Sequence, residues 1–134
     1  MNSPTFPSVD KILIVDADEH DAFTLSSQLE LGGFANRIAE DAKQGFEKYK
    51  SYSPGVTIID ANLPAKSWIQ LIQTIRQYEQ EIDPDYRSVI LVSAIKYTQE
   101  LHKNALQAGA HDVLGKPIDK DLLIKKIRER TNVY

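Results

Sequence analysis

The 134-residue sequence contains no cysteine, and it has only one methionine, one tryptophan and six glycines. Without cysteine there is no disulfide framework and no thiolate zinc site. The apolar runs, such as Val89–Val92, are far shorter than the roughly 20 residues that a membrane-spanning helix needs. Neither sign of charge forms a block of about five residues, so there is no polybasic stripe for nucleic acid or a membrane surface. We therefore expect a cytoplasmic protein that binds neither nucleic acid nor a membrane through this chain.

The length and the apolar content are those of a single domain. Hydrophobic residues make up 42% of the chain, and 16 basic against 19 acidic side chains give a net charge of −3. Chains of about 100 to 200 residues generally fold around one core. Residues 1–10 contain Pro4 and Pro7 but no apolar stretch, so we expect a flexible N-terminal tail followed by one domain over residues 11–134.

Apolar runs and helical periods alternate along the chain. Four runs are typical of strands buried on both faces of a parallel sheet: Lys11–Asp16, Thr57–Asp60, Val89–Ser93 and Asp112–Lys116. Ala35–Ala39 has polar residues at its centre and suits an edge strand. Between these segments apolar residues recur every three or four positions, which predicts amphipathic helices. We expect an α/β domain of three layers, a doubly wound (βα)5 arrangement with the flavodoxin-like strand order 2-1-3-4-5.

Local signals indicate helix ends and loops. Gly32-Gly33 and Gly109 stand where helices should end, and Ser67–Gln70 matches a capping box at a helix start. The segment Glu79–Ser88 is acidic and contains a proline, so we expect a solvated loop before the fourth strand. The histidines lack the spacing of metal ligands, and we expect them, including His111, on the surface.

Four of the predicted strands end in polar residues: Asp16, Asp60, Ser93 and Lys116. Doubly wound sheets bind ligands outside the carboxyl ends of their strands, where the strand order reverses. Because neighbouring strands lie roughly 4.8 Å apart, Asp16 and Asp60 should come close enough to share a cation, and Mg²⁺ prefers such oxygen ligands. This set favours phosphoryl transfer, with Asp60 as the nucleophile, Lys116 and Ser93 contacting phosphoryl oxygens, and Mg²⁺ neutralising charge.

Each residue also has a simpler interpretation. Asp16 and Asp60 could be helix N-caps, Ser93 a small polar strand end, and Lys116 a solvated lysine. Asp18 suits the first turn of a helix, where an acid interacts favourably with the helix dipole. The coincidence of these polar residues at the expected strand reversal favours a functional site over the simpler interpretations.

Four short segments surround the predicted strand ends: ILIVD at 12–16, IIDANLP at 58–64, VILVSA at 89–94 and GAHDVLGKP at 109–117. Together, and in this order, they resemble the response regulator receiver domain of two-component signalling. The resemblance implies that Asp60 is the phosphoacceptor and that Ser93 and Lys116 are the hydroxyl and the lysine of the site, with a cis peptide bond after the lysine. It also implies that Mg²⁺ is bound by Asp16, Asp60 and the backbone carbonyl of Asn62.

Three positions depart from the family's pattern. Receivers usually carry two adjacent acids after the first strand, whereas this chain reads Asp16-Ala17-Asp18. Ala17 stands at the position of a direct metal ligand, and Asp18 is a candidate substitute. Val113 replaces the Tyr or Phe that turns inward on activation in the family. Ala65–Trp68 replaces a turn that commonly contains glycine.

The first hypothesis is a receiver domain that is phosphorylated on Asp60, with Mg²⁺, by a histidine kinase or phosphotransfer protein, and then changes its affinity for an output protein. Such a domain is regulatory and is not a conventional enzyme. The second hypothesis, motivated by Ala17 and Val113, is a phosphate-independent module for protein interaction or homodimerisation. A small phosphate-handling enzyme is disfavoured, because the sequence has no glycine-rich phosphate loop.

Overall fold

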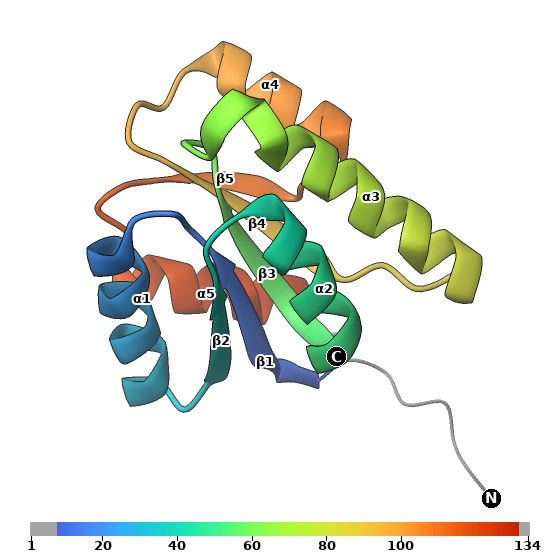
Figure 1. The fold of residues 1–134 in the computed structure, drawn as a ribbon. Coiled ribbons are helices and arrows are strands. Elements are labelled where there is room, and N and C mark those ends of the chain that lie inside the picture. The colour runs from blue at the N-terminus through green and yellow to red at the C-terminus, as the bar shows by residue number, and fades with distance from the viewer. Residues whose placement is uncertain (1–7, 132–134) are drawn as a thin grey trace, which may run out of the picture.

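The computed structural model describes residues 8–131. Strands and helices alternate along this part of the chain (Figure 1). The elements are β1 (Ser8–Val15), α1 (Glu19–Leu31), β2 (Ala35–Ala39), α2 (Ala42–Tyr52), β3 (Pro54–Asp60), the 3₁₀ helix η1 (Pro64–Lys66), α3 (Ser67–Ile82), β4 (Val89–Ala94), α4 (Gln99–Ala108), β5 (Asp112–Gly115) and α5 (Lys120–Thr131). Within these residues, no helix is both long and apolar enough to cross a membrane.

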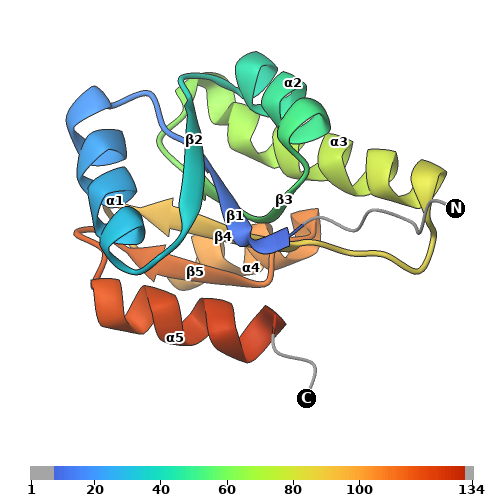
Figure 2. The same ribbon diagram turned by 90° about the horizontal axis from the view of Figure 1, so that it is seen from below.

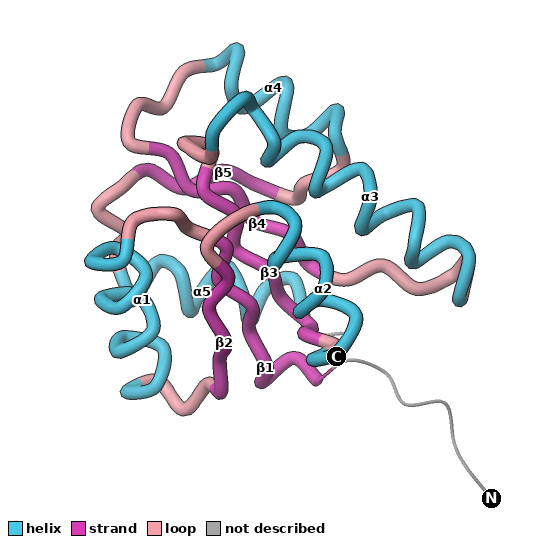
Figure 3. Tube along the Cα trace, viewed as in Figure 1, coloured by secondary structure: helices cyan, strands magenta, loops and turns pink. Residues whose placement is uncertain are grey.

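The strands form one parallel sheet in the order β2-β1-β3-β4-β5. Helices α1 and α5 pack on one face, and α2, α3 and α4 cover the other (Figures 1 and 2). Because the strands are parallel, their carboxyl ends share one edge, where the loops lead from the strands towards the following helices (Figure 3). The predicted three-layer, doubly wound fold and its strand order are confirmed.

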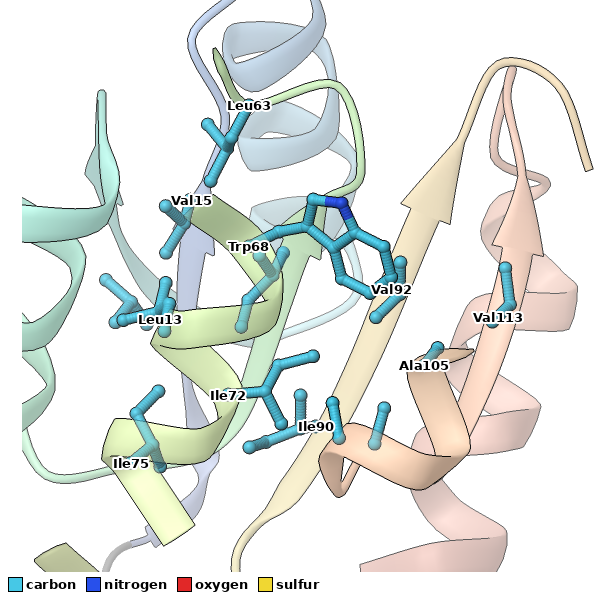
Figure 4. Close-up of a cluster of buried hydrophobic side chains, with 14 of the residues drawn as sticks. Leu13, Val15, Leu63, Trp68, Ile72, Ile75, Ile90, Val92, Ala105 and Val113 are labelled. Atoms are coloured by element: carbon cyan, nitrogen blue, oxygen red, sulfur yellow. The ribbon is translucent and has the colours of Figure 1, made fainter. Parts of the chain in front are cut away.

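Strand β1 explains why the central strands are apolar without interruption. Leu13 and Val15 belong to the core cluster beneath α2, α3 and α4, whereas Ile12 and Ile14 belong to the cluster beneath α1 and α5. Figure 4 shows the first of these clusters, in which Trp68 of α3 packs over the sheet. Since both faces of the strand are covered, successive side chains on opposite faces must all be apolar.

Two strands, β1 and β3, begin earlier than their predicted apolar runs. β1 begins at Ser8, so the flexible tail predicted for residues 1–10 is wrong for its last three residues, while residues 1–7 lie outside the described part of the chain. Ser8 pairs with Pro54, which begins β3 earlier than the expected Thr57. A ladder of backbone hydrogen bonds does not require apolar side chains at the end of a sheet. Hydrophobicity alone therefore gives strands that are too short.

The predicted capping box at Ser67–Gln70 is wrong. Ser67 is the first residue of α3, and the cap position is occupied by Lys66, which makes no side-chain cap hydrogen bond. Ala65 and Lys66 have φ angles of 56° and 53°, in the left-handed region. This conformation turns the chain from η1 into α3 without glycine. The loop therefore forms from residue types that rarely adopt such a backbone.

The predicted solvated loop at Glu79–Ser88 is also wrong in part. Helix α3 continues through Glu79 to Ile82, and the side chains of Glu79 and Ser88 are buried. The Glu79 carboxylate accepts hydrogen bonds from the hydroxyls of Tyr49 and Ser88 and lies 2.8 Å from Nη1 of Arg76. The sequence analysis places Glu79 in solvent, but its carboxylate is part of a buried polar network.

Candidate functional site

The predicted site residues lie at the carboxyl edge of the sheet. Asp16 directly follows β1, and Asp60 is the last residue of β3. Ser93 stands beside Asp60 in the register of β4, and Lys116 directly follows β5. The strand order reverses between β1 and β3, so Asp16 and Asp60 lie on either side of the switch point.

The Lys116 ammonium lies among three carboxylates. Its Nζ is 2.9 Å from Oδ2 of Asp16, 3.1 Å from Oδ2 of Asp21 and 3.4 Å from Oδ1 of Asp60. The Lys116 side chain is only 10% exposed, so these oxygens replace most of its water. The sequence analysis does not identify Asp21 as a residue of this site. The only signal in the sequence is its place in the first turn of the helix that follows Asp16. The solvated-lysine interpretation of Lys116 is wrong.

Backbone N–H groups hold the two buried aspartates. The N–H of Asp18 donates to Oδ1 of Asp16 at 2.9 Å, and the N–H of Asn62 donates to Oδ1 of Asp60 at 3.0 Å. Such local turns fix a carboxylate at the end of a strand. The helix-cap interpretation does not hold for either aspartate, because Asp18 caps α1 and Lys66 stands at the cap of α3.

The pKa of Asp60 is raised above its ordinary value. Burial of the carboxylate is the largest cause, and the N–H of Asn62 opposes it. The neighbouring Asp16 carboxylate raises the pKa further, whereas the Lys116 ammonium lowers it. One ammonium therefore does not fully offset the cost of two facing, buried carboxylates. A further cation would be stabilised at this place.

The pKa of Lys116 is also raised. Burial alone would lower it, but the hydrogen bonds to Asp16 and Asp21 and the attraction of Asp60 outweigh burial. The lysine is therefore a positive charge at neutral pH, suited to binding an anionic oxygen.

The oxygen atoms around Asp60 fit a Mg²⁺ ion. This ion usually takes one or two protein carboxylates and fills its remaining positions with water or phosphate oxygens. Asp16 and Asp60 offer two buried carboxylates, and the carbonyl of Asn62 belongs to the turn that follows Asp60. Over residues 8–131 there is no group of three or more His, Cys, Asp or Glu side chains arranged to hold a metal. Most of the coordination sphere would therefore be water.

The residues directly after Asp16 add no carboxylate to this pair. Ala17 is exposed, and its methyl group offers no ligand atom. The carboxylate of Asp18 accepts the N–H of Asp21 at 2.9 Å and caps α1. Asp18 thus acts as the cap of α1 in this structure.

Three further expectations concern the surroundings of the pair. The Ser93 side chain is buried, and its carbonyl accepts the N–H of Ala61 at 2.8 Å, which ties the end of β4 to the residue after Asp60. The peptide bond between Lys116 and Pro117 is cis, as the resemblance implies. Val113 is a buried member of the core cluster beneath α4 (Figure 4).

A groove of about 200 Å³ lies beside Lys116, between α1 and the segment that follows β5. Its walls combine polar and apolar side chains: His20, Asp21, Thr24, Leu25 and Gln28 of α1, with Lys116, Pro117 and Ile118. The contact between Asp21 and Lys116 therefore lies at the wall of an open groove.

Fold and site together define a small doubly wound α/β domain with an acidic pocket and one lysine at the strand reversal. Residues 12–128 match the model of the response regulator receiver domain. The chain belongs to this family, the receiver domains of two-component signalling.

Individual relatives agree with this assignment. The chain is 32% identical to the chemotaxis protein CheY of Bacillus subtilis, over 91% of this chain and 98% of CheY. The structure of the Francisella response regulator 1452 receiver domain has a TM-score of 0.77 at 25% identity, covering 91% of this chain and 98% of that one. A third match comes from the co-crystal structure of a Saccharomyces cerevisiae histidine phosphotransfer signalling protein and the receiver domain of its downstream response regulator. The matching chain has a TM-score of 0.79 at 25% identity, and the match covers 93% of this chain and 90% of that one.

Proposed function

We propose that this receiver domain accepts a phosphoryl group on Asp60. The observation that carries the proposal is that a buried carboxylate, Asp16, and the partly buried ammonium of Lys116 both lie against the Asp60 side chain. In the transfer, a carboxylate oxygen of Asp60 forms a bond to phosphorus, the bond from phosphorus to the donor breaks, and its electron pair leaves with the donor. The domain modifies its own side chain and has no conventional substrate.

The neighbouring residues would bind the transferred group. Lys116 would pair with one phosphoryl oxygen, and the Ser93 hydroxyl would donate a hydrogen bond to another. Asp16, Asp60 and the Asn62 carbonyl would hold Mg²⁺, which when bound supplies neutralisation of charge on the phosphoryl oxygens.

The proposed donor is a histidine kinase or a histidine phosphotransfer protein. The similar yeast receiver domain, which was crystallised with a histidine phosphotransfer signalling protein, supports this class of partner. Phosphorylation would then change the affinity of a partner-binding face for an output protein. The proposal includes the expected cytoplasmic location and involves no nucleic acid contact by this chain.

A phosphate-independent interaction or dimerisation module is the second candidate. Two observations favour it: Ala17 supplies no ligand atom, and the Lys116 ammonium already lies against three carboxylates. Both features disfavour an incoming Mg²⁺ and phosphoryl group relative to a site with a free lysine and a second adjacent acid.

Treatment with acetyl phosphate and magnesium chloride separates the two candidates. Mass spectrometry of the intact protein and of its peptides should find one added phosphoryl group, in the peptide that contains Asp60. Asp60→Asn should abolish the label, and the remote, exposed Asp85→Asn should keep it. A label that survives Asp60→Asn contradicts the assignment. A folded wild-type protein that no phosphodonor labels favours the phosphate-independent module.

A further inference from the structure

Asp21 gives the Lys116 ammonium a third carboxylate partner. A lysine ammonium has three N–H donors. Nζ donates hydrogen bonds to Asp16 at 2.9 Å and to Asp21 at 3.1 Å, and the nearest oxygen of Asp60 is 3.4 Å away. Asp21 is therefore closer to the ammonium than the proposed phosphoacceptor is. Two of the three donors are thus taken, and a phosphoryl oxygen on Asp60 would meet an ammonium whose charge Asp16 and Asp21 already largely offset.

The three carboxylates differ in how readily they release the ammonium. Asp16 is 4% exposed, and its other oxygen is fixed by the N–H of Asp18. Asp60 carries the incoming group itself. The side chain of Asp21 is 40% exposed and borders the open groove beside Lys116. Because water already reaches this carboxylate, it is the one of the three that loses least free energy when it leaves the ammonium.

We propose that Asp21 is a positioning residue that holds the Lys116 ammonium in the unphosphorylated protein and competes with the phosphoryl group for it. The inference rests on the proposed phosphorylation of Asp60. On phosphorylation, a phosphoryl oxygen binds the Lys116 ammonium, and the Asp21 carboxylate, repelled by the new anion, turns into the groove. Asp21 thus lowers the affinity of the site for a phosphoryl group, by contact with Lys116 and by repulsion of the anion.

Titration with beryllofluoride in the presence of magnesium chloride, followed by amide NMR shifts, measures this competition. Asp21→Asn removes the charge and should bind the phosphoryl analogue about fivefold more tightly than the wild type, with a smaller gain at high salt. Asp21→Glu keeps the charge and should stay close to the wild type. Glu19→Gln is the matched control, because Glu19 is an exposed acid in the same helical turn and makes no ion pair with Lys116.

A second measurement does not depend on phosphoryl binding. Acylation of lysines by acetic anhydride, mapped by mass spectrometry, should be several times faster at Lys116 in Asp21→Asn than in the wild type or in Glu19→Gln. The exposed Lys66 serves as the internal reference. Acylation proceeds through the neutral amine. Because removal of a carboxylate partner destabilises the ammonium form and uncovers Nζ, faster acylation reports the contact itself.

The outcomes separate this inference from the proposed function. Equal beryllofluoride affinity of the wild type and Asp21→Asn overturns the inference and leaves phosphorylation of Asp60 standing. Unchanged acylation of Lys116 in Asp21→Asn also overturns the inference. Failure of every variant to bind beryllofluoride overturns the proposed function, and the competition with it, even where Lys116 is acylated faster.

Discussion

Nδ1 of His111, directly before β5, accepts the backbone N–H of Ile90 in β4 at 3.2 Å. A ring nitrogen that accepts this hydrogen bond carries no proton, so the imidazole is neutral, with its hydrogen on the other nitrogen. Burial is the largest cause of the low pKa of His111, and the nearby Arg76 and Arg87 add to it, which brings the pKa to about 4. His111 is only partly exposed, so the expectation of a surface residue holds in part and misses the contact of the ring with the backbone of β4.

The first prediction concerns the pH dependence of stability. The unfolded His111 takes up a proton near its ordinary pKa of about 6.5, whereas the folded one does so only near 4. Above pH 6.5 both states are neutral, so this contribution to stability is complete there. As the pH falls from about 6.5 to about 4, the unfolded state alone binds the proton and stability declines, by about 2 kcal/mol after allowance for solvent screening of the partly exposed ring.

Urea unfolding of the wild type and of His111→Gln across this range checks the prediction. The glutamine amide can accept the N–H of Ile90 but does not titrate, and the carboxylates titrate in both proteins. The difference in unfolding free energy between the two should therefore change with pH only below about 6.5. Parallel pH profiles would contradict the assigned role of His111.

The second prediction compares two glycines with positive φ. Gly33 has a φ of 89° and open space where a side chain would begin, whereas Gly109 has a φ of 122° and a Cβ there would lie 2.9 Å from Cγ of Arg76. Gly33→Ala should cost only the backbone conformation, about 1 kcal/mol. Gly109→Ala should cost more, about 3 kcal/mol, because the Arg76 side chain must also move from a position that donates to the Gly109 carbonyl at 2.9 Å. Chemical denaturation of both variants measures the difference, and equal losses would disprove the steric argument.

The third prediction concerns Ala17 and Mg²⁺. Ala17→Asp adds a carboxylate beside Asp16 and should tighten Mg²⁺ binding about tenfold, equivalent to roughly 1.4 kcal/mol in calorimetry. Asp18→Ala should leave Mg²⁺ affinity unchanged and instead lower stability by about 1 kcal/mol, because it removes the cap of α1. Unchanged metal affinity in Ala17→Asp would show that this position does not face the metal site.

The fourth prediction concerns removal of the site lysine. Lys116→Ala leaves the facing, buried carboxylates of Asp16 and Asp60 without an ammonium, so we expect a loss of about 2 kcal/mol in chelator, with unfolding still cooperative. Magnesium chloride should restore more stability to this variant than to the wild type. Lys120→Ala, at the start of α5, is the control for loss of a lysine. A non-cooperative transition in Lys116→Ala would mean that the lysine is needed for the fold itself.

The central strands and the position of the site edge follow from local patterns, whereas the strand order is expected from the common winding of alternating strands and helices. Continuous apolar runs exist only where both faces of a strand are covered, and polar residues such as Asp16 and Asp60 end those runs at one edge of a parallel sheet. These features are encoded within a few neighbouring residues, which is why the sequence predicts them.

Contacts between distant segments are not encoded locally. In the sequence, Asp21 is indistinguishable from any acid in the first turn of a helix. Its ion pair with Lys116 becomes visible only in the folded structure. The sequence assigns Glu79 to an acidic loop. Its burial could not be predicted locally, because hydrogen bonds to its carboxylate come from α2 and from the segment before β4. The left-handed backbone of Ala65 and Lys66 is equally hidden, since neither residue type favours it.

The separation along the chain between Asp16 and Lys116, 100 residues, means that the pocket is assembled from distant parts of the sequence. Both buried carboxylates and Ser93 belong to the first four strands to leave the ribosome, whereas the ammonium arrives with the short edge strand β5. A chain that ends before Lys116 would lack the only ammonium that lies against Asp16 and Asp60 in the described residues, so the charge balance of the pocket depends on the segment that follows β5.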